Sequence, residues 1–139
     1  MAIQIRTPQQ FFAWIVAIAR AQEANGWRTE LAIRYGIAVA ILNVLGQSAP
    51  ALISGVRTID QQRALREQAA RTPGSRPVAV RSWHTVALAF DIALPYASLS
   101  LFSSLWRALG GRSGSYFTPS DPGHFDFPVS GVTPPSIND

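Results

Sequence analysis

Two histidines and one aspartate have the residue types of a metal site. His84 precedes Asp91 by seven residues, and His124 is the only other histidine in the 139-residue chain. Because the sequence has no cysteine, a transition-metal site has to be built from imidazole and carboxylate. Two imidazoles and one carboxylate are a common ligand set for catalytic zinc, and they leave a fourth coordination position for a water nucleophile.

Asp91 stands in an apolar segment, residues 87–94, that is expected to be a strand. An ionised carboxylate inside a protein costs several kcal/mol unless a partner compensates it. That partner can be a metal or an arginine, or the carboxylate can face water at a sheet edge. Asp121, three residues before His124, is the natural candidate for a general base. Spacing alone leaves these alternatives open, since a single histidine is more often an ordinary hydrogen-bonded residue.

Three segments, in order, resemble one family of zinc peptidases. Residues 82–91 resemble the Ser-x-His-x-x-Gly-x-Ala-x-Asp signature of the D-alanyl-D-alanine carboxypeptidase and dipeptidase family. This family includes phage L-alanyl-D-glutamate endopeptidases and shares its metal-site fold with hedgehog domains. Residues 54–58 are similar to its Ser-Gly-Tyr-Arg-Ser/Thr segment, residues 121–125 to its acid-x-x-His element, and residues 106–110 to a Trp-x-x-Leu-Gly stretch. The resemblance covers roughly residues 51–128 and leaves the first 50 unassigned.

The resemblance implies zinc on His84, Asp91 and His124, and Asp121 as the general base. It also implies that Arg57 stabilises the oxyanion or grips a substrate carboxylate, although an ion pair with a nearby acid such as Asp60 is the alternative. Ser82 either touches the substrate or only shapes the turn before His84. Asp rather than Glu at position 121 is more similar to the phage endopeptidases than to the dipeptidases.

Two positions depart from the family pattern. The signature glycine is Ala87 here, which requires either a negative φ or enough room for a methyl group. The tyrosine before the arginine is Val56, a change expected to affect packing more than chemistry. Neither departure replaces a predicted ligand or the predicted base.

Local signals predict the elements that must position these residues. Thr7 with Gln10, and Thr58 with Gln61, form capping boxes that start helices. Turn residues such as Asn25-Gly26 predict where helices end. Helices are expected from Thr7 to about Ala24, from Thr29 to before Gly46, from Asp60 to about Arg71 and from Ser98 to Leu109; strands are expected at 51–56, 78–80, 87–94 and 124–127.

This order of helices and short strands predicts an α+β fold, with a small antiparallel sheet carrying the zinc site. A single domain, 1–139, is expected, with a helical part (1–50), a catalytic core (51–128) and a frayed tail (129–139). The apolar N-terminal helices are expected to pack behind the sheet, with docking on a partner or membrane as the alternative. Trp83, Tyr116 and Phe117 flank the motifs and can line a substrate groove or belong to the core and its rim.

The composition limits the classes of function. All 12 basic residues are arginine, and with 8 acids the formal net charge is +4. Such a charge attracts polyanions, but no basic stripe with interleaved aromatics supports nucleic-acid binding. The apolar stretch 11–19 is too short to span a bilayer and is better interpreted as a core helix than as a signal peptide.

The expected function is a zinc-dependent hydrolysis of peptidoglycan stem peptides, at the L-Ala–D-Glu bond or at terminal D-Ala. The alternative is a non-catalytic zinc module that binds wall peptide or a protein partner, and Asp121 favours the enzyme. A monomer acting in the periplasm or at the cell wall is expected. Its setting stays open between a phage lysin released from the host cytoplasm, a tail-associated protein and a bacterial enzyme or effector.

Overall fold

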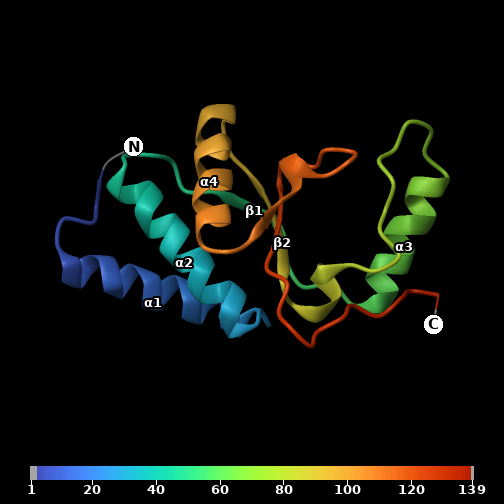
Figure 1. Cartoon of the computed structure of the whole chain (residues 1–139), viewed down its shortest axis with the longest axis horizontal. Helices are drawn as coiled ribbons and strands as arrows, with labels where there is room; N and C mark the ends of the chain where they lie inside the picture. The colour runs from blue at the N-terminus through green and yellow to red at the C-terminus, as the bar shows by residue number, and fades with distance from the viewer. Residues whose placement is uncertain (1–2, 139) are drawn as a thin grey trace.

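The computed structural model describes residues 3–138 and has an α+β fold, as predicted (Figure 1). Four strands form one antiparallel sheet in the order β1-β2-β4-β3. The helices are α1 (Pro8–Ala24), α2 (Thr29–Val44), α3 (Ile59–Ala70) and α4 (Tyr96–Ala108); the strands are β1 (Ala51–Ser54), β2 (Ala89–Ala93), β3 (Arg112–Ser113) and β4 (His124–Asp126); two 3-10 turns are η1 (Trp83–Val86) and η2 (Gly114–Tyr116).

Capping boxes start α1 and α3 where the sequence predicts them. The Thr7 hydroxyl accepts a hydrogen bond from the Gln10 backbone N–H at 3.1 Å, and the Thr58 hydroxyl accepts one from that of Gln61 at 3.0 Å. In return, each glutamine side chain accepts the backbone N–H of its threonine. The caps satisfy N–H groups that have no partner inside the helix, so the starts of both helices are fixed locally.

The two faces of the sheet have different roles because side chains alternate along a strand. Asp91 of β2 pairs with Ser54 of β1 on one side and with His124 of β4 on the other. These three polar residues therefore share one face. Phe90 and Phe125, one position away, are fully buried on the opposite face against the helices.

Phe90 lies at the centre of an aromatic core between the sheet and the helices. Its ring stacks on Trp27 and Phe125, with centroids 5.1 and 5.6 Å apart, and meets Tyr35 and Trp106 edge-on at 5.0 Å. Helix α2 supplies much of the rest of this core and packs behind the sheet, as expected. The core thus fixes β2 from behind and leaves its polar face open.

Helix α1 packs along α2 and is more exposed (Figure 1). Ala19 is its one buried residue, while Phe12 and Val16 are 65% and 46% exposed. Among residues 3–138, no helix combines the length and the apolar character needed to cross a bilayer.

Two expectations about the C-terminal half are wrong. Residues 78–80 form no strand, because their backbone lies beside the tail rather than in the sheet. The tail in turn packs instead of fraying: Ile137 is buried, its N–H donates to the Val80 carbonyl at 3.0 Å, and its carbonyl accepts from Arg63 at 2.7 Å. In Figure 1 the tail runs beside the start of α3.

Candidate metal centre

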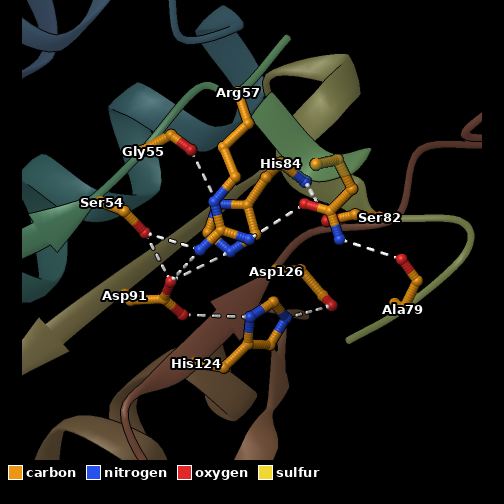
Figure 2. A network of polar contacts seen from close by, with 10 residues as sticks. Ser54, Gly55, Arg57, Ala79, Ser82, His84, Asp91, His124 and Asp126 are labelled. Atoms are coloured by element: carbon orange, nitrogen blue, oxygen red, sulfur yellow. Dashed lines mark hydrogen bonds and ion pairs between the residues drawn. The ribbon is translucent and has the colours of Figure 1, made fainter. Parts of the chain in front are cut away.

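His84, Asp91 and His124 converge on the polar face of the sheet (Figure 2). One ligand atom from each residue lies within 4.8 Å of the others. Asp91 and His124 are partners across β2 and β4, whereas His84 comes from η1, just before β2. The three residues that residue type suggested and the family resemblance implied are therefore brought together by strand register and by one short turn.

The orientation of His84 is fixed by two hydrogen bonds. The Ser82 hydroxyl accepts the His84 backbone N–H at 3.2 Å and so caps η1. The ring nitrogen Nδ1 lies 2.7 Å from the Gly55 carbonyl, which can only accept, so Nδ1 carries the proton. The other ring nitrogen, Nε2, faces Asp91 Oδ2, 3.2 Å away. Ser82 shapes this turn, and a contact between Ser82 and a substrate stays a prediction.

His124 lies between two carboxylates. Its Nδ1 is 3.3 Å from Asp91 Oδ1, and its Nε2 is 2.8 Å from Asp126 Oδ2. Asp126 is 1% exposed and accepts two further hydrogen bonds from Arg112, at 2.7 and 2.8 Å. Asp126 was not predicted from the sequence. The signal was the two-residue spacing from His124, which places both side chains on one face of a strand.

Asp91 has an arginine partner as well as the two histidines. Arg57 Nη2 donates to Asp91 Oδ2 at 2.9 Å, and the Ser54 hydroxyl donates to the same oxygen at 2.5 Å. Arg57 thus forms an ion pair with an acid, as the alternative allowed, but the acid is Asp91, and Asp60 pairs with Arg63 instead. The sequence allowed a metal or an arginine beside Asp91, and the fold places an arginine and both histidines there.

The surroundings of the carboxylates and of His124 shift their pKa values. Burial alone would raise the pKa of Asp91, but hydrogen bonds with His124, His84 and Ser54 hold it well below its usual range. Burial likewise opposes the charged form of Asp126, and its contacts with His124 and Arg112 lower its pKa. Burial would lower the pKa of His124, whereas Asp126 and Asp91 raise it to about 9. Both carboxylates are thus ionised and favour positive charge between them.

The donor set fits zinc. Bonds of about 2.0–2.1 Å to the corners of a tetrahedron place ligand atoms roughly 3.3 Å apart. His84 Nε2 lies 3.2 Å from Asp91 Oδ2 and His124 Nδ1 lies 3.3 Å from Asp91 Oδ1, so each histidine nitrogen has this spacing to one of the two carboxylate oxygens. Each histidine also has its other ring nitrogen held by an acceptor, Gly55 or Asp126, as zinc-binding histidines usually do.

Asp126→Asn is expected to weaken metal binding by about 10- to 100-fold with the fold retained. Both Asp126 oxygens accept from Arg112, and one also accepts from His124. An asparagine has only one oxygen, so its NH₂ group must face a donor of Arg112 or of His124. Competition with a chromogenic chelator measures the affinity. Unchanged affinity in the folded variant would show that Asp126 does not hold His124 in place.

Ala87 has a backbone conformation that favours glycine. Its φ is 61° and its ψ is 32°, the single positive φ of a non-glycine residue among residues 3–138. Of the two conditions named for alanine at this position, the negative φ is therefore not met. The turn is nevertheless retained, because the Leu88 N–H donates to the Trp83 carbonyl at 3.0 Å and the Ala87 carbonyl accepts from the backbone N–H of Arg28 at 3.1 Å. These neighbours hold Ala87 in the strained region.

Ala87→Gly is expected to stabilise the protein by about 0.5–1 kcal/mol. Relief of the left-handed strain raises the free energy of unfolding by about 1–2 kcal/mol. The greater conformational entropy of glycine in the unfolded chain lowers it again by about 0.4–1 kcal/mol. Urea unfolding measures the difference. Ala64→Gly, at an exposed position within α3, is the matched control and should destabilise by about 1 kcal/mol. Equal losses in both variants would show that residue 87 carries no strain.

The three residues lie in a pocket of about 470 Å³ that also contains the predicted base. Asp121 lines this pocket from the loop between η2 and β4. Its N–H donates to the Gly114 carbonyl at 2.7 Å, and its carbonyl accepts from the His124 N–H at 3.0 Å. A side chain at Gly114 would collide with the Asp121 carbonyl, so this glycine allows the loop to close. The fold therefore places Asp121 and the three converging residues around one cavity.

The remaining predicted residues divide between the pocket and its surroundings. Arg57, Ser82, Trp83 and Phe117 line the pocket together with Asp121. The Phe117 ring lies beside that of His124, with centroids 5.5 Å apart. Tyr116 does not line the pocket; it is 67% exposed and lies under the guanidinium of Arg107.

Comparison with known proteins shows the fold. No family model matches the sequence, and no curated protein sequence matches it. Among solved structures, the protein is similar to the L-Ala D-Glu endopeptidase ChiX of Serratia marcescens, with a TM-score of 0.51 and 17% sequence identity. The match covers 84% of this chain and 87% of that chain. The two proteins therefore share a fold over most of their length.

Proposed function

We propose that this protein is a zinc-dependent peptidase that hydrolyses peptide bonds in peptidoglycan stem peptides. The observation that carries the proposal is the convergence of His84, Asp91 and His124 in one pocket with Asp121. The shared fold with an L-Ala D-Glu endopeptidase supports it and favours the L-Ala–D-Glu bond over a terminal D-Ala.

His84 Nε2, His124 Nδ1 and the Asp91 carboxylate are the atoms that would hold the ion. A bound zinc ion supplies Lewis acidity, which polarises a carbonyl and lowers the pKa of a water molecule. Ser54 and Arg57 keep Asp91 oriented, and Gly55 and Asp126 do the same for the two imidazoles. The protein thus presents the ligands in a fixed arrangement before any substrate arrives.

Asp121 is proposed to move the proton. Its position in the pocket allows it to accept a proton from the attacking water and to deliver it to the leaving amine. These two transfers balance, since the peptide bond breaks to give one carboxylate and one amine.

Arg57 is proposed to have two roles. Nη2 donates to Asp91 and Ser54, and Nη1 donates to Gln62 at 3.2 Å. These contacts account for three of the five N–H groups of a guanidinium. The other two suit the developing negative charge on a substrate carbonyl oxygen, because Arg57 lines the same pocket.

The test is a digest of purified muropeptides by zinc-loaded protein, read by mass spectrometry with and without chelator. Chelator-sensitive cleavage between L-Ala and D-Glu is expected. Release of terminal D-Ala would support the peptidase activity but show that the protein cleaves a different bond. Intact muropeptides after incubation with folded, zinc-loaded protein would contradict the proposal and favour a non-catalytic zinc module.

A further inference from the structure

Four arginines line the pocket, and they fall into two pairs with different surroundings. Arg57 and Arg112 form ion pairs with Asp91 and Asp126. Arg76 and Arg81 instead donate to backbone carbonyls, those of Ser120 and Pro134. Within residues 3–138, no carboxylate lies at ion-pair distance from Arg76 or Arg81. Two guanidinium groups of the pocket therefore have their charge uncompensated by a protein acid.

Arg76 and Arg81 come from the segment between α3 and η1, which forms one wall of the pocket. The Arg76 bond to Ser120 reaches the loop that carries Asp121. Arg81 is tied to the tail by its 2.8 Å bond to Pro134 and by the backbone bridge to Ser136. Each carbonyl takes one N–H and leaves others of the guanidinium for a ligand. Both arginines are exposed, so a ligand can reach them from solvent.

The net charge of the side chains that line the pocket also favours a negatively charged ligand. Its four guanidinium groups stand against three carboxylates, those of Asp91, Asp121 and Asp126. A divalent cation on the ligands would add two further positive charges. A cleft with one predominant sign of charge attracts ligands of the opposite sign.

We infer that the substrate carries an ionised carboxylate close to the scissile bond and that Arg76 and Arg81 bind it. This inference rests on the proposed peptidase function and adds the chemical class of the substrate. A planar guanidinium binds a carboxylate through paired, charge-assisted hydrogen bonds. In a stem peptide, the residue after L-Ala is a γ-linked D-glutamate, whose α-carboxylate stands next to the bond. The amide of that carboxylate gives a neutral substrate of the same shape.

The experiment compares two L-alanyl-γ-D-glutamyl peptides that differ only in this group, a carboxylate or a carboxamide. The zinc-loaded protein is expected to cleave the carboxylate peptide with about tenfold higher kcat/KM, mainly through KM. Arg76→Gln/Arg81→Gln should reduce the preference to under about twofold, and Arg76→Lys/Arg81→Lys, which keeps the charge but not the planar fork, should retain only part of it. Arg20→Gln, the same charge change on α1, should leave it unchanged. Equal kcat/KM for both peptides, or an undiminished preference in the glutamine variant, would overturn the inference.

A binding measurement separates this inference from the proposed function. Calorimetry with the zinc-loaded Asp121→Asn protein gives the Kd of both peptides without turnover. If the wild type cleaves neither peptide, the proposed function is wrong. The inference then stands only if the carboxylate peptide binds about tenfold more tightly and this difference shrinks with added salt. Equal Kd values, or binding of neither peptide, would overturn it.

Discussion

Asp121→Asn is expected to lower kcat by about 100- to 10,000-fold, the range for loss of a general acid–base group. Asparagine keeps the size and shape of the side chain but cannot take a proton from water. The backbone bonds of Asp121 to Gly114 and His124 involve no side-chain atom, so the loop should keep its shape. Steady-state hydrolysis of a stem peptide, with zinc content measured on the same sample, tests this expectation.

Zinc content separates loss of the base from loss of the metal. Asp121→Asn should retain one zinc per chain and a similar KM. Asp60→Asn, which changes an exposed acid on α3, is the matched control and should leave kcat within about twofold. Full activity in the Asp121→Asn protein would assign proton transfer to another group. Loss of zinc would instead assign Asp121 to the metal site.

His84→Ala is expected to remove stoichiometric zinc and all measurable peptidase activity. His84 is 2% exposed and presents Nε2 to Asp91 because Gly55 holds its other ring nitrogen. Without this imidazole, two of the three ligands remain, and we expect zinc affinity to fall by more than about 100-fold, beyond the loss seen for a partner of a ligand. Metal analysis after dialysis against a known free zinc concentration measures the change.

Removing a buried ring can also destabilise the protein, so a second variant is needed. His84→Gln keeps more of the buried volume and provides an amide in place of the imidazole. Circular dichroism establishes that each variant is folded. One zinc per chain with unchanged affinity in folded His84→Gln and His84→Ala proteins would remove His84 from the ligand set.

Local sequence signals predicted the helices well because the relevant contacts are local. The capping boxes at Thr7 and Thr58 involve residues three positions apart. Pro8 in the first turn of α1 and Asn25 at its end have equally short-range effects. The α+β class and the strand around Asp91 could be predicted for the same reason, from a short apolar run and the turns beside it.

The features that were missed depend on partners distant in sequence. The segment 78–80 is apolar enough for a strand, but it lies beside Ile137 of the tail rather than beside a sheet strand. Nothing near Arg57 indicated that its partner is Asp91, 34 positions away. These pairings arise from the tertiary fold, which local propensity does not contain.

The candidate site shows the same division. Residue type and spacing suggested His84, Asp91 and His124, and strand register with one turn brings them together. Asp126 and Gly55, which hold the two imidazoles, were not predicted: the two-residue spacing of Asp126 from His124 is common in strands, and a backbone carbonyl has no side-chain signal. Ala87 differs from these residues. The sequence shows that it replaces the signature glycine, but only the backbone shows that it adopts a left-handed conformation.

A zinc titration of metal-stripped protein during hydrolysis of a stem peptide tests whether the protein is a zinc peptidase. We expect no cleavage without metal, a rate that rises in proportion to added zinc, and a plateau at one zinc per chain. Full activity of the metal-free protein, or a folded and fully loaded protein that cleaves no stem peptide, would contradict this expectation.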